Sequence, residues 1–272
     1  MGRIARSWRL LEQSYGMLKQ DRELMLLPLI SLVAIGAVLL SFVLGMSGLG
    51  LIGGESVEAE SPVFGVAAFA YYVITYTIAI FFQAAVIAGA TERMRGGDPT
   101  VRSSIAAAYE RLPVIVVYGL IAATVGMLIR SVQERSEMVG RIVMGLIGMV
   151  WSLAVFYMVP VLVLEREGVG PSFKRSWAVF KRTWGETVVG SFGFGWIGVM
   201  LGIPIVLVAI LLMKIGLPLL AIVIGGLGGA ALGLFLSTLQ GIWVASLYRY
   251  ATEGEVPRGY DRALLEGAFR QK

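Results

Sequence analysis

The side chains that could do chemistry are few, and most lie next to an arginine. The chain of 272 residues has no histidine and no cysteine, so it lacks the commonest general base, the commonest metal ligand and any thiolate nucleophile. Glu92, Glu165 and Glu167 remain as carboxylates that could activate water. Their neighbours are Arg93 and Arg166, a pattern more typical of ion pairs at a membrane surface. We therefore expect no catalytic residue, no metal site and no cofactor.

Two amides, Gln83 and Gln240, interrupt long apolar runs. Each lies about seven or eight residues from the end of its run, so the two positions are plausible equivalents. Amides within a membrane span usually form hydrogen bonds between helices. The alternative is a polar intramembrane cluster beside a cavity, with Gln83 and Gln240 as its candidate members.

The composition identifies the elements that must carry these residues. Hydrophobic residues make up 57% of the chain and charged residues 15%, against about 45–50% and about 25% in soluble domains. A bilayer core needs about 20 apolar residues of helix. Six runs without Asp, Glu, Lys or Arg meet or approach that length: 24–54, 61–91, 112–129, 142–164, 187–213 and 215–248. The sequence predicts an all-α fold, a polytopic membrane protein with six transmembrane helices in a single membrane domain spanning 1–272.

The charges predict the orientation. Nineteen of the 23 Lys and Arg residues fall in the two terminal segments and the 2–3 and 4–5 connections. By the positive-inside rule these segments are cytoplasmic, so we expect a multi-pass protein of the plasma (inner) membrane with both termini inside. The net charge of +5 is then explained by topology and lipid contact, and no nucleic-acid partner is expected. No acidic residue lies inside a run, which weighs against proton-driven transport.

The basic segments resemble one another. Arg6–Gly16 aligns with Arg175–Gly185 at an offset of 169, and a weaker copy near Pro99 places Ser104 opposite Ser176. The pattern predicts a unit of one amphipathic helix followed by two spans, used three times. The candidate units are 1–97, 98–169 and 170–256, with a C-terminal amphipathic helix at 258–270.

In each copy, apolar residues recur at i, i+4, i+7 and i+11, which is one face of a helix. A helix with such a face and a basic opposite face lies in the membrane interface, with aromatic rings at headgroup depth. The candidate membrane-interface residues are Arg6, Trp8, Arg9, Tyr15, Lys174, Arg175, Trp177 and Trp184.

Small residues four apart are frequent in the last two runs, as in Ser191/Gly195 and Gly198/Gly202. Such pairs let helix backbones approach closely within a bilayer. We expect most of them to serve packing.

The segment from Pro160 to Trp177, Pro-Val-Leu-Val-Leu-Glu-Arg-Glu-Gly-Val-Gly-Pro-Ser-Phe-Lys-Arg-Ser-Trp, resembles a broad group of bacterial and archaeal six-span proteins. That group includes uncharacterised membrane families and the membrane domain attached to some glycerophosphoryl diester phosphodiesterases. The resemblance covers the whole chain in layout, and it implies no catalytic residues. The soluble phosphodiesterase domain has no counterpart in this sequence.

These observations favour a non-enzymatic membrane scaffold or accessory protein. Its expected partners are membrane lipids, through their headgroups, and a membrane-protein partner or a second copy in a homo-oligomer. The alternative is a permease or lipid-translocating protein without proton coupling. A lipid-modifying enzyme is disfavoured because the spans carry no His, Cys or acid.

Overall fold

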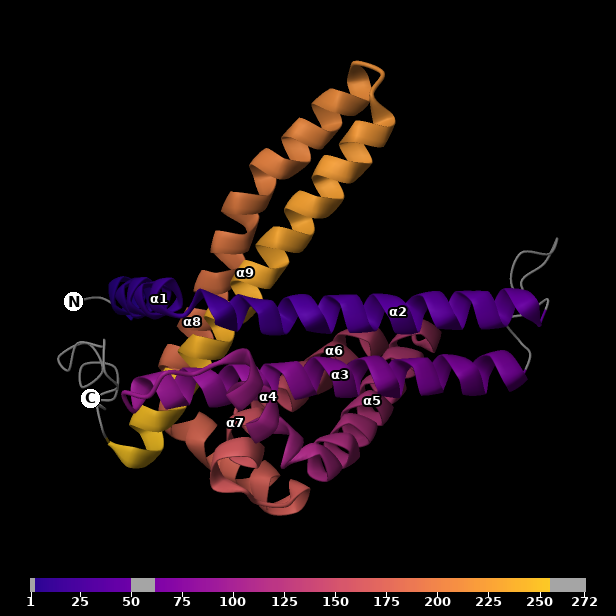
Figure 1. Ribbon diagram of the computed structural model, residues 1–272. Helices are drawn as coiled ribbons and strands as arrows, with labels where there is room; N and C mark the ends of the chain where they lie inside the picture. The colour runs from indigo at the N-terminus through magenta and orange to yellow at the C-terminus, as the bar shows by residue number, and fades with distance from the viewer. Residues whose placement is uncertain (1–2, 50–61, 255–272) are drawn as a thin grey trace. The chain divides into compact units, whose positions relative to one another are not determined.

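The computed structural model describes residues 3–49 and 62–254, including all side chains except those of 3–11, 186, 189, 190 and 192. Every element in these ranges is helical (Figure 1). The elements are α1 (Arg3–Gln20), η1 (Arg22–Met25), α2 (Leu26–Gly48), α3 (Pro62–Met94), α4 (Val101–Tyr109), α5 (Leu112–Arg135), α6 (Met138–Ala154), α7 (Met158–Pro160), η2 (Val161–Glu165), α8 (Val169–Lys214) and α9 (Pro218–Glu253).

Six segments are long and apolar enough to cross a membrane: Arg22–Gly48, Pro62–Met94, Leu112–Arg135, Met138–Glu165, Gly193–Lys214 and Pro218–Glu253. Much of their apolar surface is exposed, as for Leu219 and Leu227 on α9. A large exposed apolar surface is typical of helices that face lipid. The predicted all-α, six-span fold is confirmed, and the protein is a multi-pass membrane protein.

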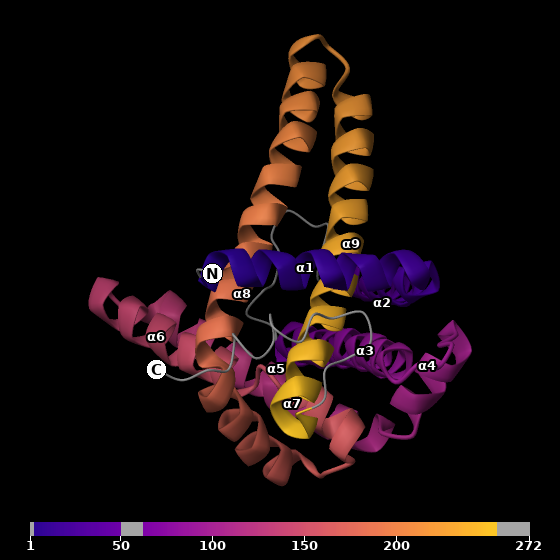
Figure 2. The ribbon, with the colours of Figure 1, turned by 90° about the vertical axis from the view of Figure 1, so that its left-hand side faces the viewer.

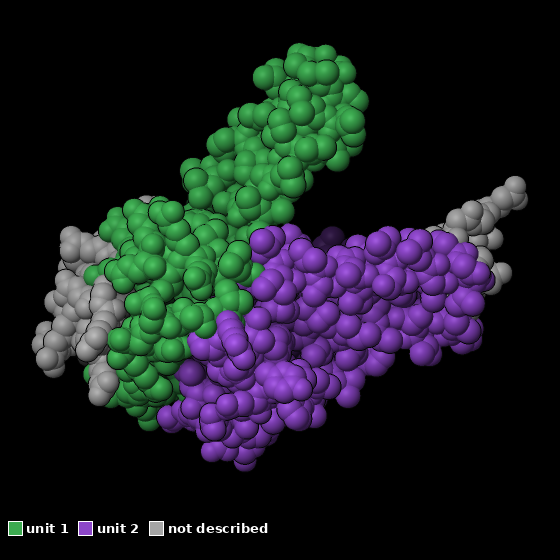
Figure 3. All heavy atoms as spheres, in the orientation of Figure 1, with its two compact units in different colours: residues 1–26, 89–101, 178–272 green, residues 27–88, 102–177 purple. Residues whose placement is uncertain are grey.

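The chain divides into two compact units (Figure 3). Unit 1 comprises residues 1–26, 89–101 and 178–272, and unit 2 comprises 27–88 and 102–177. The three-unit repeat stays a prediction because these two units reflect packing and not sequence similarity. The predicted C-terminal helix at 258–270 lies outside the described residues.

In unit 1, α8 and α9 run side by side as a hairpin (Figures 1 and 2). Glycines bring them together: a Cβ at Gly198 would lie 3.2 Å from Leu236, and one at Gly228 would lie 3.0 Å from Ile205. The connection contains Gly216 at φ +81°, a left-handed conformation that glycine adopts without steric cost. The predicted packing role of the small residues therefore holds for Gly198.

Helix α1 packs against α9 within the same unit. The ring of Tyr15 lies 5.9 Å from that of Phe235 in an edge-on arrangement. Met17 and Leu18 at the end of α1 are buried. The first amphipathic segment is therefore a helix, as predicted, and its C-terminal half packs on protein.

In unit 2, α5 packs along α6, and the ring of Phe42 on α2 lies 5.0 Å from that of Tyr71 on α3. A Cβ at Gly119 would lie 2.4 Å from Thr77 Oγ1, so α3 and α5 are also in close contact. Small residues thus mediate packing in this unit too.

The fourth span is not one continuous helix, although its sequence predicts a single run. Helix α6 ends at Ala154, and the π-helical turn η2 follows α7. Pro160 has no N–H to donate to the carbonyl four residues earlier, and its ring clashes there. Ser176 of α8 supplies the missing partners: its Oγ donates to the Ala154 carbonyl oxygen at 2.7 Å and accepts from the Tyr157 N–H at 3.1 Å.

The third amphipathic segment is not a separate helix, and the interfacial position of a helix before each pair of spans stays a prediction. Residues 169–186 continue directly into the fifth span as the first turns of α8, a helix of 46 residues. At 1.5 Å per residue α8 is about 69 Å long, more than twice the hydrocarbon thickness of about 30 Å. Helices α1 and α4, in contrast, end before their spans begin.

Candidate functional site

The N-terminal part of α8 exposes basic and aromatic side chains, which we call the basic–aromatic face. Trp184 is 57% exposed and Trp177 is 37% exposed. The face consists of Lys174, Trp177, Lys181, Arg182 and Trp184, all of them exposed. Within the described part of the chain, Lys174 and Arg182 form no ion pair.

The other side of this helix is buried and carries small hydroxyl side chains. Its buried residues are Ser172, Ser176, Val179, Thr183 and Thr187. Thr183 donates to the Val179 carbonyl at 3.0 Å, and Thr187 Oγ1 lies 3.1 Å from Thr183 Oγ1. Small side chains allow this side of the helix to pack on protein, and the large aromatic rings therefore project outward.

The predicted stripe Phe173, Trp177, Phe180, Trp184 is divided by this packing. Phe180 is buried, whereas the other three are exposed. The ring of Phe173 stacks on that of Trp151, with centroids 5.9 Å apart. The sequence identified the aromatic positions, but the helix turns its hydroxyl stripe toward the protein.

Arg175 lies beside an acid. Its Nε donates to Glu165 Oε1 at 2.8 Å, and its side chain is 39% exposed. Arg175 therefore differs from Lys174 in having a carboxylate partner within unit 2. We exclude it from the basic–aromatic face.

The candidate interface residues of α1 are described only in part. The backbone of Arg6, Trp8 and Arg9 is helical. The side chains of these three residues lie outside the described part of the structure. Tyr15 is exposed, and the Lys19 ammonium lies 4.6 Å from the centre of its ring. Tyr15 thus combines a lysine contact with the Phe235 contact.

The two intramembrane amides are both exposed. Gln83 belongs to unit 2 and Gln240 to unit 1. Neither makes a hydrogen bond with any described residue. A polar cluster of the two stays a prediction.

Unit 1 has an ion-pair cluster that the sequence did not indicate. The Arg93 guanidinium forms a two-point pair with the buried Asp21 carboxylate, and it also donates to Asp98 Oδ1 at 2.7 Å. Asp21 precedes η1, whereas Arg93 lies in the last turn of α3. Bidentate pairing to a carboxylate is both stronger and more directional than a single contact, so it holds these two helix ends in a defined register.

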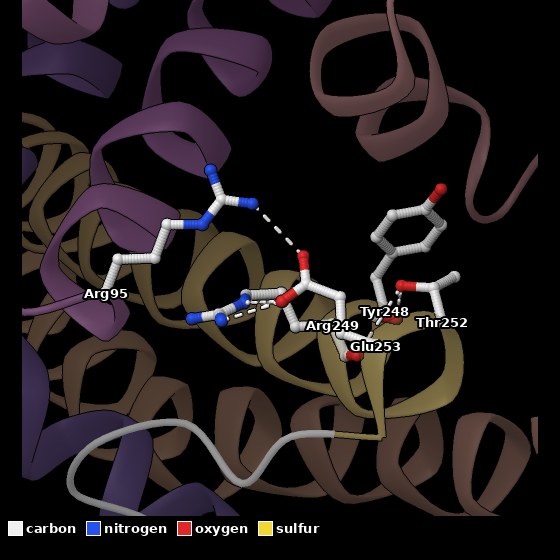
Figure 4. A network of polar contacts seen from close by, with 5 residues as sticks. All are labelled: Arg95, Tyr248, Arg249, Thr252 and Glu253. Carbon is white, nitrogen blue, oxygen red and sulfur yellow. Dashed lines mark hydrogen bonds and ion pairs between the residues drawn. The ribbon is translucent and has the colours of Figure 1, made fainter.

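A second ion-pair cluster lies at the end of α9 (Figure 4). Glu253 accepts from Arg249 Nε at 2.8 Å and from Arg95 at 3.1 Å. The Thr252 hydroxyl donates to the Tyr248 carbonyl at 2.8 Å. Glu253 is thus held between two guanidinium groups, which suits a structural tie better than proton transfer.

In unit 2, Arg111 donates hydrogen bonds to the last turn of the fourth span and to the segment that follows it. It donates to the Leu162 carbonyl at 2.9 Å and to the Glu167 carbonyl at 2.7 Å. Beside it, Arg166 pairs with Glu110 at 2.6 Å. Of the carboxylates singled out as conceivable catalysts, Glu165 pairs with Arg175, and Glu167 accepts from Arg111 through its backbone carbonyl.

The missed clusters had only a weak signal in the sequence. Asp21, Arg93 and Arg249 each flank an apolar run, which marks them as residues at span ends. Asp21 and Arg93 are 72 positions apart, and Arg95 and Glu253 are 158 positions apart. No local pattern specifies pairs that are so distant in the sequence. In the described part of the chain, no three acidic side chains lie close enough together to hold a metal ion.

Residues 63–258, more than half of the chain, match the family described as "Family of unknown function (DUF6159)". No curated protein and no solved structure matches the chain. The predicted resemblance is thus supported for a family of unknown function, and no link to glycerophosphoryl diester phosphodiesterases is found.

Proposed function

We propose that this chain, which belongs to the DUF6159 family of unknown function, is a non-enzymatic scaffold or accessory protein that binds anionic lipid headgroups. The observation that supports this role is the basic–aromatic face of α8. Its cations and its tryptophans are exposed on one helix, next to the fifth span. Exposed basic groups attract anionic lipid, and indole rings favour the depth of the headgroups.

The length of α8 supports the same placement. The charge-free run of the fifth span begins at residue 187 and the helix begins at Val169, so the basic–aromatic face occupies the turns before the hydrocarbon. The positive-inside pattern of the sequence places these turns on the cytoplasmic side, where the leaflet is rich in anionic lipid. The proposal therefore includes a plasma (inner) membrane location with both termini cytoplasmic.

A charge-neutralised variant tests the proposal. Each basic residue near an anionic surface contributes about 1 kcal/mol, so Lys174→Gln/Arg182→Gln should weaken phosphatidylglycerol binding by about 2 kcal/mol, roughly 30-fold. The full-length protein would be released from mixed micelles of phosphatidylglycerol and phosphatidylcholine, and its bound lipids would be counted by native mass spectrometry.

The matched control is Arg135→Gln/Arg141→Gln, which removes the same charge from exposed arginines of the 3–4 connection. The proposal requires this control to keep its phosphatidylglycerol. Equal retention in wild type and both variants would refute headgroup binding by α8. Hydrolysis of the lipid during the incubation would refute the non-enzymatic part.

A further inference from the structure

An open groove of about 450 Å³ lies on the membrane part of α8 in unit 1. Its described lining is Ser191, Gly195, Trp196 and Val199. The volume falls within the range of about 300–1,000 Å³ typical of small-molecule sites. An ideal Cβ on Gly195 would have no other atom within 4 Å, so this glycine leaves open space where Gly198 does not.

The chemistry of the groove is apolar. The Ser191 hydroxyl donates to the Thr187 carbonyl at 2.7 Å, which uses its only proton. Gly195 presents no side chain, and Trp196 is 64% exposed with its ring available for packing. A hydrocarbon chain suits this lining, whereas a polar solute would find few hydrogen-bonding partners.

The groove continues the direction of the basic–aromatic face. Lys181, Trp184, Ser191 and Gly195 are spaced by three, seven and four residues, which puts them on one side of an α-helix. At 1.5 Å per residue, Gly195 is about 17–21 Å along the axis from Trp184 and Lys181. Half of a hydrocarbon core of about 30 Å is about 15 Å, so the distance corresponds to one leaflet.

From these observations, and resting on the proposed function above, we propose that α8 binds one anionic phospholipid along this side. The phosphate lies beside Lys181 and Trp184, and one acyl chain occupies the groove at Ser191–Val199. The positive charge of Lys181 favours an anionic headgroup. The distance along α8 from Lys181 and Trp184 to Gly195 is close to the depth of one leaflet, which favours a lipid over a second helix as the occupant. The ligand class is a two-chain phospholipid such as phosphatidylglycerol.

Filling the groove tests the proposal without touching the headgroup contact. Gly195→Leu places a side chain in open space, so the fold should tolerate it. The matched control is Gly229→Leu on α9, where a Cβ likewise meets nothing within 4 Å and the residue is exposed. Native mass spectrometry of the full-length protein with dioleoyl and dihexanoyl phosphatidylglycerol gives the readout.

We expect wild type and Gly229→Leu to retain one dioleoyl lipid and Gly195→Leu to lose it. The dihexanoyl lipid, whose chains are too short to reach Gly195, should not be retained by any of the three. Retention of the dioleoyl lipid by Gly195→Leu would refute binding of the acyl chain in the groove. If Lys174→Gln/Arg182→Gln still loses lipid in that case, headgroup binding by the basic–aromatic face stands without the groove. A wild-type dimer that Gly195→Leu converts to a monomer would also refute binding of the acyl chain, because a second copy would then fill the groove.

Discussion

The hydroxyl of Ser176 should stabilise unit 2 by several kcal/mol, because it is the partner of two backbone groups at the break in the fourth span. In a continuous helix the Ala154 carbonyl would accept from the Met158 N–H, but that N–H bonds to Val155 instead, at 2.9 Å. The Leu153 carbonyl, which the Tyr157 N–H would reach in a continuous helix, accepts from the Phe156 N–H at 3.4 Å. Ser176 Oγ serves both orphan groups, and both Ser176 and Tyr157 are fully buried.

Ser176→Ala removes both hydrogen bonds and leaves a buried carbonyl and a buried N–H unpaired. Each such group costs about 1–3 kcal/mol, so the free energy of unfolding should fall by about 2–6 kcal/mol. The assay is equilibrium unfolding of the full-length protein in mild detergent, titrated with sodium dodecyl sulfate and followed by circular dichroism. Hydrogen exchange of the peptide containing Tyr157 should accelerate in the same variant.

Ser104→Ala is the matched control. Ser104 is equally buried, and it aligns with Ser176 in the predicted repeat, but its hydroxyl has no hydrogen-bond partner among the described residues. Removing an unpaired hydroxyl should leave stability unchanged or raise it slightly. The reasoning is refuted if Ser176→Ala and Ser104→Ala shift the unfolding free energy equally, or if exchange at Tyr157 does not change.

Two further predictions concern unit 1, and both use the same unfolding titration. Asp21→Ala should cost about 1.5–3 kcal/mol because it removes the charged hydrogen bonds between the Arg93 guanidinium and a buried carboxylate. Asp98→Ala should cost less than about 1 kcal/mol, since Asp98 is 91% exposed and Asp21 only 5%; equal costs would contradict the assignment. Gly228→Leu should destabilise the α8–α9 hairpin by about 1–3 kcal/mol because its Cβ would press on Ile205, and Gly229→Leu should not, so a similar loss in both variants would argue against close packing at Gly228.

Much of the fold followed from local composition. The six spans lie close to the predicted runs, and α3, α5 and α9 each end two to five residues after the first charged residue that follows the run. Lys174, Trp177 and Trp184 of α8 were also predicted from the sequence as interface candidates, whereas Lys181 and Arg182 were not. The break at Val155–Tyr157 was not predicted. Pro160 indicates a disrupted helix, but the break is stabilised by a hydrogen bond from Ser176, which lies 16 residues later.

The ion-pair clusters show most clearly what could not be predicted from the sequence. A charge beside an apolar run is expected at a span end, and the sequence is sufficient to place Arg93 and Arg249 there. Whether Arg93 meets Asp21 or another acid depends on which helix ends converge in three dimensions. The same holds for Gly195 and Gly198, which look alike in sequence although only Gly198 contacts α9.

The sequence by itself thus determined that the chain is a six-span membrane protein, because hydrocarbon accepts only long apolar helices and that requirement acts on each segment separately. Tertiary structure alone decided which side of each helix is used. Packing within a membrane is driven by shape and hydrogen bonding between neighbours, so the buried hydroxyl stripe, the outward tryptophans and the open groove of α8 emerge only when the partner surfaces are in place.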